Sequence, residues 1–187
     1  MATASTISPL TVEEFVELQA GFDRPVELIT GEIVEMSQPR DPRGAIAINV
    51  GLLFKLYKRS HGGRYGADGI VTGEATVRGP DVYYISSERL GEYDEAKHKR
   101  AGFWAIPPTV CVEVISPNET SVDIQQKIED CIEFGVDEFW IIEPELRSLQ
   151  LHWPSGASRV LRGDDPIATQ ALPELTATVA AIFEDIE

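Results

Sequence analysis

One carboxylate inside an apolar run constrains this chain more than any other residue. Residues 109–115 read Thr-Val-Cys-Val-Glu-Val-Ile, which has the length and β-branched content of a strand buried on both faces. An unpaired carboxylate is strongly disfavoured in such a place, so Glu113 needs a cation, a metal ion or a proton as its partner. The simplest alternative to a functional site is a buried ion pair with an arginine such as Arg43 or Arg78.

Two further carboxylates occupy similar positions. Asp81 follows a proline and heads the apolar run 82–85, and Glu27 lies inside the short apolar run 26–29. Pro-Asp pairs are common at turns, so a capping role for Asp81 stays open. Taken with Glu113, however, these are more strand carboxylates than solvated faces usually explain in a domain of this size.

A lysine follows on the next helix. A polar turn after residue 115 leads into the apolar periodicity of residues 121–134, and Lys127 lies on the flank of the apolar stripe of that helix. From there its ammonium can reach the strand that carries Glu113. The alternative is a surface lysine whose stem covers the core edge and whose charge pairs with Asp123 or Asp130.

Two strand carboxylates and a helix lysine suit a divalent-metal site for phosphodiester hydrolysis. The ligands available are oxygens, which favours Mg²⁺ or Mn²⁺ over zinc. The three histidines, His61, His98 and His152, fall in separate contexts and do not form a ligand set. The sequence contains no Gly-rich phosphate loop and no serine or cysteine nucleophile in an elbow.

Length and composition favour one globular domain. The 187 residues, 43% hydrophobic and 25% charged, suit a flexible leader at 1–10 and a single domain over 11–187. The leader lacks the features of a signal peptide, and no apolar stretch approaches the roughly 20 residues of a membrane helix. Cys111 and Cys131 read as buried core residues in a reducing compartment. We therefore expect a cytoplasmic protein that does not contact membranes.

The net charge of −15 opposes nucleic-acid binding over a broad surface, because phosphate contacts supply most of that affinity. Basic residues concentrate only at 97–100 and at Lys55, Lys58 and Arg59. Binding of nucleic acid must then be local and salt-sensitive, and divalent metal would offset part of the charge.

The order of the expected elements indicates an α/β fold. The segment 109–115, the helix 121–134 and the strand 139–142 form a βαβ unit, so the two strands are expected to be parallel. The remaining pattern predicts a mixed central sheet flanked by helices, with an edge hairpin near the C-terminus. The further elements expected are a helix at 11–20, a hairpin at 26–29 and 33–36, a helix at 43–60, two short strands within 64–80, a strand at 81–85, a partly helical stretch at 86–102, the hairpin strands near 149–153 and 158–162, and a short helix within 172–186.

Several short segments, taken in order, resemble the Uma2 family of restriction-endonuclease-like proteins. The resemblance spans roughly residues 11–183 and implies a PD-(D/E)xK nuclease core. The segments are Thr-Val-Glu-Glu-Phe at 11–15, Val-Glu-Leu-Ile-Thr-Gly-Glu-Ile-Val-Glu-Met at 26–36, Gly-Pro-Asp-Val at 79–82, Val-Glu-Val-Ile-Ser-Pro at 112–117, Asp123 with Lys127, Gly-Val-Asp-Glu-Phe-Trp-Ile-Ile-Glu-Pro at 135–144, and Leu-Pro-Glu-Leu at 172–175.

Carried over position by position, the resemblance implies that Asp81 and Glu113 hold the metal, Mg²⁺ or Mn²⁺. The backbone carbonyl of Val114 would be a third ligand, and Glu27 would complete the acidic cluster.

The lysine position departs from the superfamily pattern. The usual lysine place, two residues past the glutamate, holds Ile115 here, and the resemblance implies that Lys127 replaces it from the following helix, as in the Uma2 group. Family members often have a histidine where Arg43 or Gly44 stands, which puts a role of that helix in phosphate or metal contact in doubt.

The function that this resemblance implies is metal-dependent hydrolysis of phosphodiester bonds in nucleic acid, with DNA as the first candidate. We also expect the protein to form a homodimer. The competing hypothesis is a catalytically inactive nuclease fold that serves as a dimeric binding module, because fold alone does not establish function.

Overall fold

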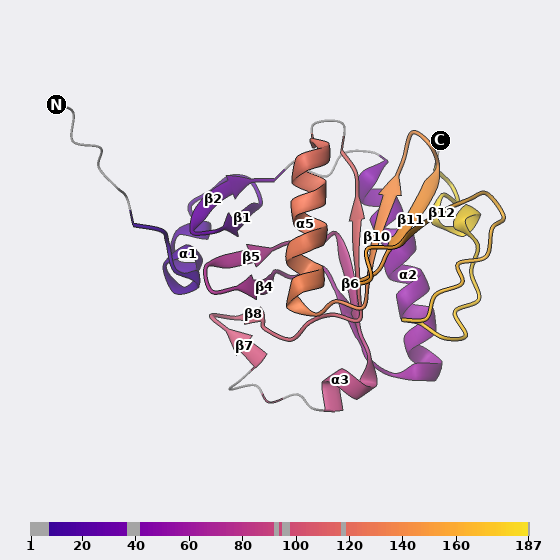
Figure 1. The fold of residues 1–187 in the computed structure, drawn as a ribbon, viewed down its shortest axis with the longest axis horizontal. Helices are drawn as coiled ribbons and strands as arrows, with labels where there is room; N and C mark the ends of the chain where they lie inside the picture. The colour runs from indigo at the N-terminus through magenta and orange to yellow at the C-terminus, as the bar shows by residue number, and fades with distance from the viewer. Residues whose placement is uncertain (1–7, 37–41, 92–93, 95–97, 117–118, 187) are drawn as a thin grey trace.

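The structure is a computed structural model that describes residues 8–36, 42–91, 94, 98–116 and 119–186. Residues 1–7 of the expected leader lie outside this part of the chain. The described elements form two β-sheets with helices packed on them (Figure 1). Among the described residues, no helix combines the length and the apolar character needed to cross a membrane.

The central sheet contains the βαβ unit that the sequence predicts. In the described chain its order is β12-β11-β10-β9-β6-β3, with β9 and β10 parallel and joined through α5. The predicted C-terminal hairpin is confirmed, and it extends this sheet at one edge. The bounds are β3 Arg64–Gly66, β6 Val82–Ile85, β9 Val110–Val114, α5 Ser121–Phe134, β10 Glu138–Glu143, β11 Ser148–His152 and β12 Ser158–Arg162.

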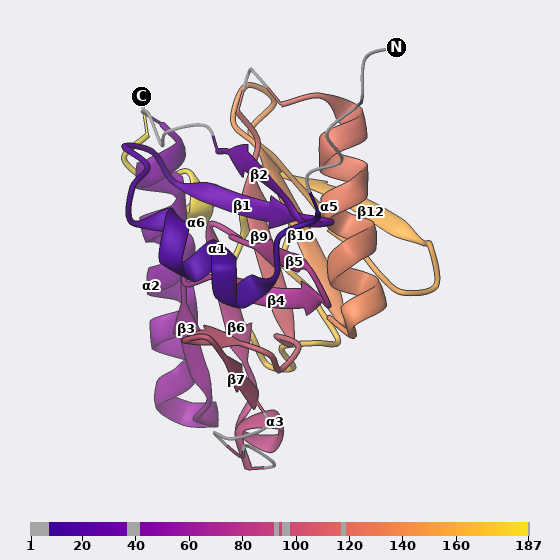
Figure 2. The same cartoon turned by 90° about the vertical axis from the view of Figure 1, so that its left-hand side faces the viewer.

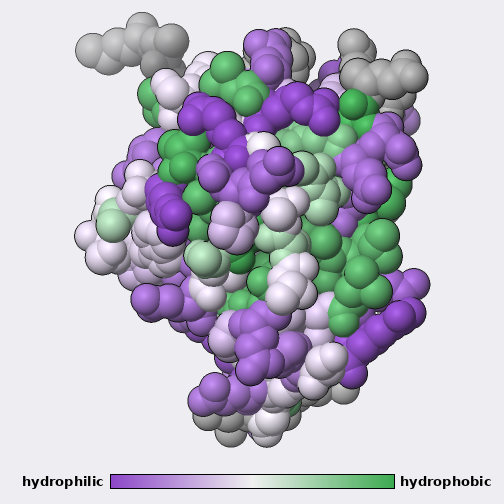
Figure 3. Space-filling view, turned by 90° about the vertical axis from the view of Figure 1, so that its right-hand side faces the viewer, coloured by the Kyte–Doolittle hydropathy of each residue, from purple (hydrophilic) through white to green (hydrophobic). Residues whose placement is uncertain are grey.

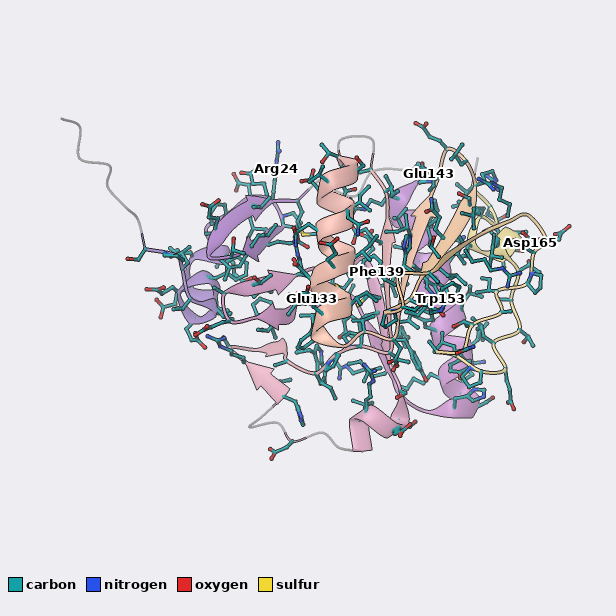
Figure 4. All side chains as sticks on the ribbon, in the orientation of Figure 1. Arg24, Glu133, Phe139, Glu143, Trp153 and Asp165 are labelled. Atoms are coloured by element: carbon teal, nitrogen blue, oxygen red, sulfur yellow. The ribbon has the colours of Figure 1, made fainter. Side chains whose placement is uncertain are left out.

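Two long helices cover opposite faces of this sheet. Helix α5 lies in front of the sheet in Figure 1 and helix α2 (Arg43–His61) lies behind it, and the turned view in Figure 2 separates the three layers. The buried residues of β9 alternate accordingly: Val110, Val112 and Val114 pack with α2, and Cys111 packs with α5. Phe139 lies in the layer between α5 and the sheet (Figure 4). Strand alternation therefore sends Glu113 toward α5.

Helix α5 has local signals at both ends. The Thr120 hydroxyl accepts a hydrogen bond from the backbone N–H of Asp123, whose carboxylate accepts one in return from the backbone N–H of Thr120. Gly135 ends the helix at φ 110°, a conformation that favours glycine. Both ends of the helix are thereby fixed, and this determines on which side of the helix Lys127 lies.

A second sheet, which the sequence did not predict, lies beside the first. Its order in the described chain is β2-β1-β5-β4-β8-β7, and Val12 and Phe15 of helix α1 pack on it. The predicted capping box at Thr11 and the hairpin of β1 and β2 are confirmed. The bounds are α1 Val12–Gln19, β1 Val26–Ile29, β2 Glu32–Glu35, β4 Ile70–Gly73, β5 Thr76–Arg78, β7 Lys99–Arg100 and β8 Phe103–Trp104.

One predicted segment needs correction. The segment 64–80 contains the three strands β3, β4 and β5 where two were expected, because its glycines punctuate it more often than two strands require. The partly helical character predicted for 86–102 is confirmed by the short helix α3, Ser87–Gly91. The short helix predicted within 172–186 is confirmed as one turn, α6 Val179–Ile182.

Candidate functional site

Asp81 and Glu113 meet at neighbouring positions of two adjacent strands. The antiparallel register pairs Val82 with Val112, so Asp81 comes to lie beside Glu113 and on the same face of the sheet. One guanidinium nitrogen, Arg43 Nη2, lies 3.0 Å from Asp81 Oδ1 and 2.8 Å from Glu113 Oε1. The backbone N–H of Val114 donates to Asp81 Oδ2 at 2.8 Å. The two predicted metal carboxylates therefore converge.

Arg43 is the cation that joins them. It is the first residue of α2 and is buried, and its Nε donates to both carboxylate oxygens of Asp81 at 3.1 Å. Its Nη1 lies 3.8 Å from Glu119 Oε2 and has no hydrogen-bond partner. Arg43 was one of two arginines predicted as alternative partners of Glu113, and the structure shows this ion pair.

Lys127 points into the same cluster. Its Nζ lies 3.1 Å from Glu113 Oε1 and 3.4 Å from Glu27 Oε1, and the residue is only 7% exposed. The surface alternative does not hold, because Asp123 caps its own helix and Asp130 binds Arg78. Lys127 thus bridges the carboxylates of β1 and β9 from helix α5.

Glu27 joins the cluster through this lysine and through Arg78. Arg78 Nη1 donates to Glu27 Oε2 at 2.9 Å, and the backbone N–H of Gly79 donates to Glu27 Oε1 at 2.8 Å. Arg78 Nε also donates to Asp130 Oδ2 at 2.7 Å. Glu27 is therefore held firmly between two cations, next to Lys127.

Burial controls the proton affinity of Glu113. Its pKa is raised to about 8, mainly by loss of water and in smaller part by the nearby carboxylates Asp81 and Glu119, while Lys127 and Arg43 act in the opposite direction. Burial lowers the pKa of Lys127, but Glu113 and Glu27 outweigh this, so its pKa lies above the ordinary value and the ammonium stays charged. The site thus pairs a permanently charged lysine with a carboxylate that can exchange a proton near neutral pH.

The oxygen donors fit a hard divalent cation, provided that Arg43 gives way. Glu113 Oε2 is buried and has no hydrogen-bond partner, which is the state expected of an oxygen built to meet a further ligand. Among the described residues no group of three or more His, Cys, Asp or Glu side chains is arranged to hold a metal ion. A cation would therefore depend on Asp81, Glu113 and a backbone carbonyl such as that of Val114, and it would compete with the Arg43 guanidinium for the carboxylate oxygens.

Sequence reasoning missed two members of this cluster. Glu119 accepts a hydrogen bond from the backbone N–H of Ser116 at 2.7 Å and faces Arg43. Its position in the polar turn just after β9 was a usable signal. Arg78 was named only as a possible partner of Glu113, whereas it binds Glu27 and Asp130.

Comparison with known proteins places this geometry in context. The sequence pattern of the Uma2 family, described as "Putative restriction endonuclease", matches residues 12–180. The chain is similar in structure to a protein from Anabaena variabilis ATCC 29413 described as "a putative nuclease belonging to DUF820", with a TM-score of 0.76, 19% identity, and coverage of 94% of this chain and 98% of that chain. At this identity the likeness shows the fold, a mixed α/β nuclease fold, in agreement with the predicted fold class. No curated protein matches the sequence.

Proposed function

Because the chain belongs to the Uma2 family, we propose that it is a metal-dependent nuclease that hydrolyses phosphodiester bonds of nucleic acid, with DNA as the first substrate to test. The observation that carries the proposal is the arrangement around Glu113. Asp81 and Lys127 converge on this buried carboxylate, and one of its two oxygens has no hydrogen-bond partner. Most buried polar side-chain atoms in native structures have a hydrogen-bond partner, so this free oxygen supports a site that takes a further ligand.

In this proposal Asp81, Glu113 and the carbonyl of Val114 would hold Mg²⁺ or Mn²⁺, which would supply Lewis acidity toward a phosphodiester and a water molecule. Lys127 stabilises negative charge that develops on the phosphate. This electrostatic stabilisation is strong because the ammonium is almost fully withdrawn from water. Glu27 and Arg78 have a positioning role. Glu27 holds the Lys127 ammonium beside Glu113, and Arg78 in turn holds the Glu27 carboxylate.

The charge of the chain sets the conditions under which it would bind nucleic acid. With a net charge of −15, long-range attraction to a polyanion is absent, so binding must come from short-range contacts and must weaken steeply with salt. Activity should accordingly be greatest at low ionic strength and with a divalent ion present.

The test is nicking of supercoiled plasmid at low salt with millimolar Mg²⁺ or Mn²⁺. Wild type is expected to nick, and Glu113→Ala to fall to the metal-free background. The matched control is Glu129→Ala, which removes an exposed carboxylate from the outer side of α5 and should retain wild-type activity. Loss of nicking in both variants would point to general damage.

Lys127→Met separates catalysis from metal binding. The substitution keeps most of the packing of the buried stem and deletes the charge, so cleavage should fall by about a hundredfold or more. Metal binding, followed by the shift in melting temperature with added Mn²⁺, should persist because the carboxylates remain. Full activity of Lys127→Met, with Glu113→Ala inactive, would show that the lysine is not catalytic and would make Arg43 the next candidate.

A second candidate function is a metal-free binding module of the same fold. The observation that favours it is Arg43, whose guanidinium already neutralises Asp81 and Glu113 without any metal. If wild type cleaves neither DNA nor RNA with Mg²⁺ or Mn²⁺, and its melting temperature does not respond to either ion, this function replaces the nuclease.

A further inference from the structure

The outer face of α2 carries an apolar stripe that nothing in the described chain covers. Ile48, Leu52 and Leu56 follow one another at helical spacing and are 72%, 50% and 46% exposed. The band of hydrophobic residues along the right-hand side of Figure 3 runs over this helix. Three large apolar side chains in one line on a surface helix are more than scattered exposure explains, and such patches mark contact sites.

The backbone beside this stripe is bare. Gly44 and Gly51 stand on the same outer side of α2, and a Cβ built on either meets nothing within 4 Å. Gly51 lies in the helix interior, where glycine is destabilising by about 1 kcal/mol relative to alanine, and the structure shows no close contact within the chain that requires it. The absence of side chains at these two positions allows another helix to approach closely.

Charge divides the two ends of the stripe. Lys55 and Arg59 are exposed on the C-terminal half of α2. The N-terminal half lies beside the exposed Glu184 and Asp185, because Asn49 Nδ2 donates to the backbone carbonyl of Glu184 at 2.9 Å. Arg147 offsets part of this negative charge, because its guanidinium donates to the backbone carbonyls of Phe183 and Ile186. The surface is therefore positive at one end, apolar in the middle and weakly negative at the other.

We propose that this face is the interface of a homodimer in which α2 packs antiparallel on α2 of a second copy. A two-fold axis near Leu52 brings Ile48 against the partner's Leu56, and the same rotation lays Lys55 and Arg59 over the acidic end of the partner. An isologous contact of this kind needs a surface that is complementary to itself after a half turn. The apolar centre with opposite charges at its ends has that property.

The net charge of the chain strengthens the choice of a second copy as the occupant. Two molecules that each carry −15 repel one another at most orientations, because acidic residues dominate their surfaces. One of the few places where basic residues gather is the C-terminal half of α2, with Lys55, Lys58 and Arg59. Antiparallel pairing places these cations against acidic groups, so association is favoured in this orientation and weakened by salt.

Sedimentation velocity of the full chain over a range of concentrations tests the proposal. Wild type is expected to be a dimer at low salt, and Leu52→Glu a monomer at every concentration at which wild type is dimeric. Val122→Glu, which alters a 74% exposed valine on α5, is the matched control and should remain a dimer. Circular dichroism and melting temperature verify that each variant is folded, and because Leu52 is half exposed its substitution should leave the fold intact.

Charge reversal distinguishes the orientation. Lys55→Glu with Arg59→Glu should weaken the dimer by about tenfold or more, and adding Glu184→Lys with Asp185→Lys should restore it. A monomeric wild type, or a Leu52→Glu variant that stays dimeric like the control, overturns the proposal. So does a result in which the charge variants lose DNA binding while sedimentation is unchanged, since α2 would then be a nucleic-acid surface.

Discussion

Two buried glutamates on neighbouring parallel strands have opposite surroundings. Glu113 on β9 is 1% exposed and Glu138 on β10 is 0% exposed. Glu138 accepts one hydrogen bond on each oxygen, from the indole N–H groups of Trp140 and Trp153, both at 2.6 Å. Glu113 has Arg43 and Lys127 on one oxygen and no partner on the other. Figure 4 shows Trp153 on the side of the β10 strand toward the C-terminal hairpin, away from α5.

Burial alone therefore does not identify a functional carboxylate. The donors of Glu138 are neutral, fixed and complete, which is the arrangement of a structural polar group. The partners of Glu113 are charged and leave one oxygen free, so a different cation can replace them. Surface shape does not identify the site either. A groove of about 1270 Å³ has Glu138, Trp153 and Arg159 among its lining residues, and Glu113 is not one of them.

The same substitution at both glutamates tests most directly whether they contribute differently to stability. Glu138→Gln places an amide NH₂ against an indole N–H, two donors with no acceptor between them, so the free energy of unfolding should fall by about 2–3 kcal/mol. Glu113→Gln should change it by no more than about 1 kcal/mol at neutral pH. Because burial raises its pKa to about 8, Glu113 is largely protonated at neutral pH, so glutamine replaces a neutral carboxylic acid with a neutral amide of nearly the same shape.

Urea unfolding of the two variants beside wild type measures both values. A larger loss in Glu113→Gln than in Glu138→Gln would show that the Glu113 cluster is the structural one, and the contrast between the two glutamates would be wrong.

The two glutamates also differ in what the sequence could tell. Glu113 was recognised because valines flank it on both sides. Its convergence with Asp81 was predicted because Asp81 also heads an apolar run and because both residues match metal positions implied by the Uma2 resemblance, and the strand register brings the two together. The helical period placed Lys127 only on the flank of the apolar stripe, and its role came from the same resemblance. Glu138, at the head of an apolar strand, gave no warning that Trp153 would cross the hairpin to bind it, since that contact depends on how β11 pairs with β10.

The parts that were missed depend on long-range or very short elements. The contact between Arg43 and Asp81 joins positions far apart in the chain. From the sequence, Arg43 was only one of two possible arginine partners for Glu113. The second sheet escaped because β7 and β8 have two residues each, too few for a periodic pattern to appear. Sequence pattern therefore located the carboxylates, the family resemblance assigned the lysine, and packing decided which arginine lies among them.

Arg43 sharpens the comparison by testing whether the Glu113 partners are replaceable. In Arg43→Gln the guanidinium no longer competes for the oxygens of Asp81 and Glu113, so the dissociation constant for Mn²⁺ should fall by about tenfold, which corresponds to about 1.4 kcal/mol. Calorimetric titration measures it. Glu138→Gln should bind Mn²⁺ like wild type. Equal affinity in wild type and Arg43→Gln would mean that the cation does not bind where the arginine lies.

The smallest effect expected is a pH dependence that belongs to Glu113 alone. Burial raises its pKa from 4.5 to about 8, so between these values the folded state holds a proton that the unfolded state has lost. The stability contributed by that proton is fully present below the unfolded pKa and declines as pH rises through the folded one.

A metal ion binds the ionised carboxylate, so the apparent affinity for Mg²⁺ should rise about fivefold from about pH 7 to about pH 8. Melting temperatures with and without Mg²⁺ at each pH measure this, with Glu138→Gln expected to follow wild type. In Glu113→Gln the response to Mg²⁺ should be weak and should not vary with pH, and a rise there equal to that of wild type would assign the titration to another group.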